Sequence, residues 1–109
     1  MIAKRPSIFI YTNDADAEIL REICAGIEEE GVFFEVFQKD MKDTDVLAWE
    51  AANDSMMGSG IGISGKHAAL QMRGLKAGEN VSVLEGTSKD VCRALGVNSA
   101  RIIKKMPLK

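Results

Sequence analysis

Histidine, cysteine and proline are scarce in this sequence, which contains one, two and two of them in 109 residues. Cys24 and Cys92 lie far apart without a C-x-x-C spacing, and His67 cannot complete a zinc-binding set with two cysteines alone. The composition therefore argues against a zinc site formed by this chain by itself. We expect both cysteines to be reduced and structural, filling the core as small apolar side chains.

An excess of basic charge and a long apolar run are also missing. Fourteen basic and sixteen acidic residues give a formal net charge of -2, so no basic field is available to attract a phosphate backbone. Lys4 and Arg5 precede an apolar run that covers only residues 8–11, far less than a signal peptide or a membrane span needs. We expect a cytoplasmic protein without nucleic acid or membrane partners.

The residues that are present predict one folded domain over residues 1–109. Hydrophobic residues make up 46% of the chain and charged residues 28%, which is the balance of an ordinary globular domain. Runs rich in β-branched and aromatic residues predict strands. The predicted strands are residues 7–11, 32–37, 57–64 and 80–84. Residues 66–73 fit a short helix or an edge strand, and we prefer the strand.

Apolar residues spaced three and four apart predict helices between these strands. The predicted helices are residues 17–27 with Gly31 after the end, a segment from Thr44 or Asp45 to residues 53–55, and a segment after the turn at residues 86–88 that Gly96 and Asn98 interrupt. Strands that alternate with helices favour parallel pairing through crossover connections. We therefore expect an α/β fold, a three-layer α/β/α sandwich around a mainly parallel sheet with one antiparallel strand.

Gly60, Gly62 and Gly65 match the pattern G-x-G-x-x-G. In dinucleotide-binding proteins this pattern brings backbone amides close to a pyrophosphate at the start of a helix. Here the first two glycines lie inside a predicted strand, and neither Glu79 nor Glu85 has the context of the acidic residue that contacts the ribose. We expect close backbone packing in the sheet. The alternative is a small flavodoxin-like nucleotide- or phosphate-binding protein or enzyme.

Glu28, Glu29 and Glu30 place three carboxylates at the end of the first predicted helix. The negative end of the helix dipole lies there and repels them, so a compensating charge is expected. Either the run is a solvated helix end, or one carboxylate reaches a partner's cation or a metal ion, because Mg2+ prefers hard oxygen ligands. A single carboxylate is not a metal site, so the other ligands would come from a partner chain or a nucleotide.

No group of residues in the sequence predicts catalysis. His67 lies beside Lys66, but a histidine base normally needs a nucleophile and an orienting acid, and neither can be assigned. We interpret His67 as a surface or interface residue. Trp49 has helical spacing from Val46 and Ala52 and is predicted to lie in the core. The chain is not expected to be an enzyme.

Four segments together resemble the small subunit of diol/glycerol dehydratase reactivating factors. They are residues 26–31 (GIEEEG), 48–52 (AWEAA), 60–63 (GIGI) leading to Lys66 and His67, and 98–104 (NSARIIK). The similarity extends over most of the chain, and the first two segments are its most specific parts. Residues 12–16 and 76–90 match less closely. They leave open whether the client dehydratase acts on propane-1,2-diol or on glycerol.

The resemblance implies a function without catalysis by this chain. Small subunits of this kind pair with a large, actin-like ATPase subunit in an α2β2 assembly. That assembly releases damaged cobalamin from an inactivated dehydratase, so that adenosylcobalamin can enter. The small subunit resembles the medium subunit of the dehydratase without its cobalamin-binding part, and the implied mechanism is exchange with that subunit.

The resemblance also implies which residues meet the partner. Mg2+ and ADP or ATP would be bound at the large subunit, and this chain alone would bind no cofactor. Glu29, the middle carboxylate, is expected to reach the metal, and the expected interface residues are Glu28, Glu29, Glu30 and His67. Association with a bacterial microcompartment stays open, as does a third interpretation, an unrelated structural module with the same fold.

Overall fold

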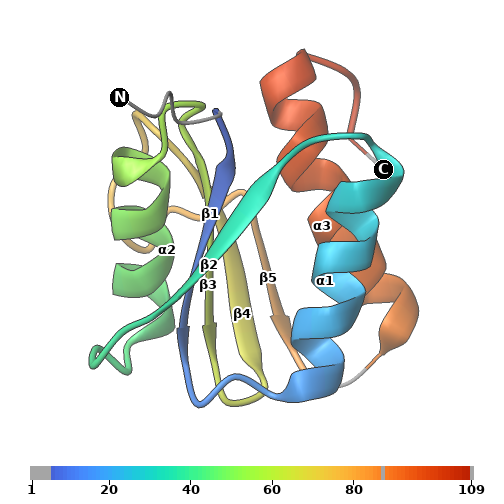
Figure 1. Ribbon diagram of the computed structural model, residues 1–109. Helices are drawn as coiled ribbons and strands as arrows, with labels where there is room; N and C mark the ends of the chain where they lie inside the picture. Colours follow the sequence, from blue (N-terminus) through green and yellow to red (C-terminus); the bar gives the residue numbers. More distant parts are fainter. Residues whose placement is uncertain (1–5, 87, 109) are drawn as a thin grey trace, which may run out of the picture.

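The computed structural model describes residues 6–86 and 88–108, so Lys4, Arg5 and residue 87 lie outside the described part. Strands and helices alternate in the first half of the described chain, and three successive strands and a final helix follow (Figure 1). The strands are β1 (Ile8–Asn13), β2 (Phe34–Gln38), β3 (Ser59–Ser64), β4 (His67–Met72) and β5 (Ser82–Glu85), and the helices are α1 (Ala17–Glu29), α2 (Thr44–Asp54) and α3 (Lys89–Lys104). None of the described helices is long and apolar enough to cross a membrane.

The strands form one mixed sheet with the order β2-β1-β3-β4-β5. β1 pairs in parallel with β2 and β3, whereas β4 pairs antiparallel with both β3 and β5. The predicted antiparallel strand is therefore β4, which runs against both of its neighbours. The preference for a strand over a helix at residues 66–73 is confirmed.

The positions of the helices follow from the order of the strands. The chain passes from β1 to β2 on one side and then back past β1 to β3, so two right-handed connections place α1 and α2 on opposite faces of the sheet. After β3, β4 and β5 follow without an intervening helix, and α3 then packs beside α1 (Figure 1). The three predicted layers are α2, the sheet, and the pair of α1 and α3.

Each face of the sheet has its own apolar cluster. In β1, Ile8 and Ile10 point into the larger cluster under α1 and α3, where both are completely buried. Phe9 and Tyr11 contribute to the smaller cluster under α2, because successive side chains of a strand point to opposite faces. The hydroxyl group of Tyr11 donates a hydrogen bond to the carboxylate of Asp54 at the end of α2.

Gly60 and Gly62 allow α2 to lie close against β3. A Cβ atom at residue 60 would be 2.1 Å from the backbone nitrogen of Ala52, and one at residue 62 would be 2.5 Å from the backbone nitrogen of Ala48. Both distances are shorter than real Cβ contacts. These glycines therefore serve close backbone packing, as predicted, although the backbone they admit is that of α2 rather than a strand of the sheet. β3 leads into a hairpin rather than into the helix that a dinucleotide site requires.

The same close packing explains why the prediction for Trp49 is wrong. Trp49 is 39% exposed instead of lying in the core. The side of α2 that faces the sheet consists of Leu47, Ala48, Ala51 and Ala52, which are fully buried. A helix this close to the sheet has space beneath it for small side chains, and the indole therefore lies on the outer side.

Two helix boundaries also differ from the predictions. Gly96 and Asn98 do not interrupt the last helix, because α3 continues through both of them to Lys104. The N-cap of α2 is Asp43 instead of Thr44 or Asp45, and its side chain accepts hydrogen bonds from two backbone N–H groups of the first turn. α2 continues as far as Asp54, two residues into the stretch 53–55 that was expected to break it.

Replacing Gly62 by alanine is expected to lower the free energy of unfolding by about 3 kcal/mol, because the new methyl group would collide with the backbone of α2. Urea unfolding followed by circular dichroism measures this change. Gly31→Asn is the control, since residue 31 has open space around it and asparagine tolerates the left-handed conformation. Equal stability of the two variants would contradict the packing role of Gly62.

Candidate functional site

The acidic run lies at the end of α1. The helix begins where the carboxylate of Asp16 accepts hydrogen bonds of 3.0 Å from the backbone N–H groups of Glu18 and Ile19. It ends at Glu29, and Gly31 follows with φ at +71°, the left-handed conformation that glycine adopts after helices. The predicted end of the helix is confirmed, so its three carboxylates surround the negative end of the dipole.

Two glycines bring α1 and α3 into close contact. A Cβ atom at Gly26 would lie 2.2 Å from the carbonyl oxygen of Arg93, and one at Gly96 would lie 2.0 Å from the carbonyl oxygen of Ile23. The two helices run in the same direction (Figure 1). Basic side chains of α3 therefore meet acidic side chains of α1 in order along both helices.

Arg93 of α3 binds two carboxylates of α1. Its Nη2 and Nε atoms lie 2.7 and 3.2 Å from Oε1 of Glu22, and its Nη1 lies 2.8 Å from Oε2 of Glu29. Glu22 and Glu29 are two helical turns apart and share one face of α1, with Gly26 between them. The hydrogen bonds to Glu29 and then to Glu22 raise the pKa of Arg93.

The other two carboxylates of the run have different surroundings. Oε1 of Glu30 lies 3.5 Å from Nζ of Lys104 and 3.7 Å from Nε of Arg101, and Lys104 also donates to the backbone carbonyl of Glu30. Glu28 is exposed and has no ion-pair partner within residues 6–86 and 88–108. α3 thus supplies the positive charge that the sequence led us to expect at the end of α1.

Sequence reasoning did not identify Arg93, Arg101 or Lys104 as the source of that charge. A signal was present, because residues 93, 101 and 104 recur at intervals that place them on similar sides of one helix. The predicted interruptions at Gly96 and Asn98 concealed it, since they separated Arg93 from the other two residues.

Glu29 has the chemistry of a single metal ligand. Its side chain is 46% exposed, and its bond to Arg93 uses Oε2, so Oε1 has no partner among the described residues. Carboxylate oxygen is the donor type that Mg2+ prefers. Within the described residues, no group of three or more His, Cys, Asp or Glu side chains is placed to hold a metal ion. The remaining ligands would have to come from another molecule.

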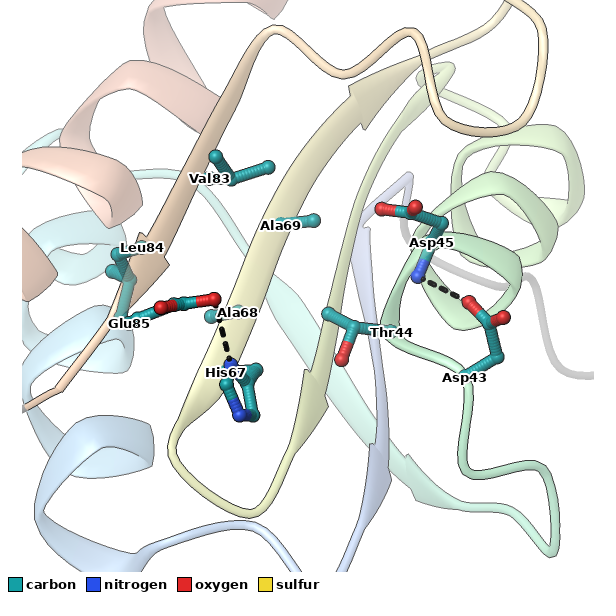
Figure 2. Close-up of a pocket in the computed structure, with 9 residues that line it drawn as sticks. All are labelled: Asp43, Thr44, Asp45, His67, Ala68, Ala69, Val83, Leu84 and Glu85. Atoms are coloured by element: carbon teal, nitrogen blue, oxygen red, sulfur yellow. Dashed lines mark hydrogen bonds and ion pairs between the residues drawn. The ribbon is translucent and has the colours of Figure 1, made fainter.

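His67 lies far from the acidic run, in a pocket of about 400 Å3 between β4, β5 and the start of α2 (Figure 2). Its Nδ1 atom lies 3.5 Å from Oε1 of Glu85, and its side chain is 59% exposed. The predicted surface position is confirmed. Asp43 and Asp45 lie on the other side of the pocket, where Asp45 also accepts a hydrogen bond from Asn80. A role for His67 at an interface stays a prediction.

The structure disfavours the alternative of phosphate binding at the glycine-rich segment. In open α/β sheets such ligands bind beyond the carboxyl ends of the strands, at the point where the strand order reverses. Here the loop after β1 and the turn after β3 are joined by hydrogen bonds from Asp16 N–H to the Gly65 carbonyl oxygen, 2.8 Å, and from Gly65 N–H to the Asn13 carbonyl oxygen, 3.2 Å. These amides are therefore already in use, and the carboxylates of Asp14 and Asp16 would repel an anion.

Both cysteines are free and belong to the packed interior. Cys92 is buried, and the partly buried Cys24 packs against the same core. Burial, followed by the charge of Glu28, raises the pKa of Cys24 to about 11, and burial also raises the pKa of Cys92. Protonated thiols are poor nucleophiles and poor metal ligands, so the predicted structural role of both residues is supported.

The fold and the ion pairs define a small α/β domain in which the two helices of one layer are joined by charged side chains. A family comparison identifies that domain. The chain belongs to the dehydratase medium subunit family, whose model matches residues 5–109.

The relatives of this chain are small subunits of reactivating factors. The propanediol dehydratase-reactivating factor small subunit of Citrobacter freundii is 28% identical over 105 residues, which cover 95% of this chain and 90% of the relative. The diol dehydratase-reactivating factor small subunit of Klebsiella michiganensis is also 28% identical, with 95% and 84% covered.

Solved structures agree with this relationship. The structure of diol dehydratase-reactivating factor complexed with ADP and Mg2+ matches with a TM-score of 0.90 at 28% identity, covering 97% of this chain and 99% of the other. A glycerol dehydratase reactivase matches with a TM-score of 0.91 at 30% identity, covering 96% and 97%. The resemblance stated from the sequence is confirmed.

Alkylation by iodoacetamide should show the protonated state of Cys24. At pH 8 we expect the native protein to react at least about tenfold more slowly than the same protein in urea, because a thiol with a raised pKa is almost entirely protonated. Glu28→Gln should accelerate the native reaction, since it removes a negative charge that opposes the thiolate. Rapid native alkylation of the unsubstituted chain would contradict this account.

Proposed function

We propose that this chain is the small subunit of a dehydratase reactivating factor and catalyses no reaction itself. The observation that carries the proposal is the match over nearly the whole chain to a glycerol dehydratase reactivase, with a TM-score of 0.91. The charged groups of the chain support a binding role, because Glu29 and Glu30 at the end of α1 are paired with α3 instead of surrounding a reactive group.

The proposed action is exchange of subunits. The chain belongs to a family named for the dehydratase medium subunit. A shared fold would allow this chain to take the place of the medium subunit in the dehydratase. A large, actin-like ATPase subunit would assemble with this chain as α2β2 in the cytoplasm and supply the nucleotide cycle. Exchange on an inactivated diol or glycerol dehydratase would release damaged cobalamin and admit adenosylcobalamin. Different contacts in different nucleotide states would couple the two events.

Glu29 is the proposed contact with the nucleotide site of the large subunit. The solved relative was determined with ADP and Mg2+, and Glu29 presents an exposed carboxylate with one oxygen unused by the described residues. A magnesium ion bound to phosphates commonly takes only one or two protein carboxylates. One ligand from this chain is therefore sufficient for its part in such a site.

Reconstitution tests the proposed function directly. The chain should copurify with the large subunit from the same organism, and both together should restore activity to a dehydratase whose cobalamin has been damaged, in the presence of ATP, Mg2+ and adenosylcobalamin. The large subunit alone should restore much less. Full recovery without this chain, or failure of the two subunits to associate, would overturn the proposal.

Glu29→Gln is expected to weaken association with the large subunit by at least about tenfold when Mg2+ and ADP are present, because the shape is retained and only the charge is lost. Isothermal titration calorimetry measures this affinity. Asp40→Asn is the matched control, since Asp40 is an exposed carboxylate outside the predicted interface, and we expect less than a threefold change. An unchanged affinity for Glu29→Gln would remove Glu29 from the metal site.

A further inference from the structure

Arg93 occupies a position between two carboxylates that differ sharply in exposure. The side chain of Glu22 is 16% exposed, whereas that of Glu29 is 46% exposed. Arg93 directs two nitrogen atoms, Nη2 and Nε, at the same oxygen of Glu22, and its remaining terminal nitrogen at Glu29. The largely buried carboxylate of Glu22 therefore fixes the guanidinium group, and the guanidinium group in turn holds the exposed carboxylate of Glu29.

This arrangement uses the geometry of arginine. The guanidinium group is planar and rigid, so fixing one edge of it also fixes the direction of the Nη1 donor. A lysine ammonium group is a point charge on a flexible chain and cannot transmit orientation from one carboxylate to another. Gly26 completes the arrangement, because any larger residue at position 26 would displace the backbone of α3 at Arg93.

The geometry points to Arg93 as a positioning residue for the metal contact of this subunit. Anchored by Glu22, it holds Oε2 of Glu29 and leaves Oε1 free to bind the divalent cation at the large subunit. This inference rests on the proposed role of Glu29. Carboxylates that bind metals are usually themselves hydrogen-bonded, and loss of such a partner commonly costs about 10- to 100-fold in metal affinity.

A purely structural role predicts a different behaviour. An exposed ion pair between two helices contributes little to stability. The pair of Glu29 with Arg93 is of this kind, and so is the pair of Glu18 with Lys89, 3.3 Å apart, between the same helices. If Arg93 only joined the helices, its removal would resemble removal of Lys89 and would not depend on the metal. If Arg93 positions Glu29, its effect appears only when the cation is present.

The experiment measures the affinity of this chain for the large subunit by calorimetry, once with ADP and Mg2+ and once with ADP and EDTA. Arg93→Gln should weaken binding by about tenfold or more with Mg2+, and by less than twofold with EDTA. Arg93→Lys should not rescue binding. Lys89→Gln, which removes the ion pair with Glu18 between the same helices, should change neither affinity.

Combination with Glu29→Gln separates the inference from the proposed function on which it rests. In that background Arg93→Gln should have no further effect, because there is no longer a carboxylate to position. A loss with Glu29→Gln but none with Arg93→Gln would overturn the role of Arg93 and leave the metal contact standing. If Glu29→Gln itself had no effect, the metal contact would fail, and the inference with it.

A second variant covers the case in which Arg93→Gln disturbs the fold. Glu22→Gln retains the shape of the buried side chain but removes the charge that anchors Arg93, and it should reproduce the loss of affinity with Mg2+. A weakening that is equal in Mg2+ and in EDTA for both variants would show that the residues are structural, and would overturn the inference. Thermal unfolding of each variant shows directly whether the fold is retained.

Discussion

The close approach of helix to helix and of helix to sheet is the constraint on which the rest of this structure depends. Four glycines permit it. Gly60 and Gly62 admit the backbone of α2 to β3, and Gly26 and Gly96 admit α1 and α3 to one another. A Cβ atom at any of these positions would meet backbone atoms, which cannot rotate away as a side chain does. The three layers can therefore lie this close together only because these positions lack side chains.

The charged surface is a product of the same contact. Carboxylates at the end of a helix are unfavourable by themselves, but α3 lies close enough and runs in the right direction to supply a cation to two of the three. Glu30 is balanced by Arg101 and Lys104, and Glu29 by Arg93. Glu29, the proposed contact residue, thus belongs to the cluster that balances the end of α1, with Glu28 left exposed beside it.

Much of the fold could be predicted because its signals are local. Alternation in β1, the glycine after α1 and the hairpin strand β4 are each visible within a few residues, and the family resemblance added the class of protein. The exposure of Trp49 and the continuity of α3 through Gly96 could not be predicted in the same way. Each depends on which element lies opposite, and a glycine that packs against another helix has the same local appearance as one that ends a helix. Arg93, the partner of Glu29, was missed for this reason.

The strand order also has a consequence for the nascent chain. β1 lies inside the sheet, and its two neighbours are made later: Phe9 pairs with Glu35 on one side and with Gly60 on the other. β3, β4 and β5, by contrast, pair in succession as they leave the ribosome. While about fifty residues are being synthesised, β1 therefore presents apolar side chains on both faces and an open edge, the state in which chains aggregate or recruit chaperones. A protein proposed to remodel other assemblies is thus itself most prone to aggregate before β2 and β3 have enclosed β1.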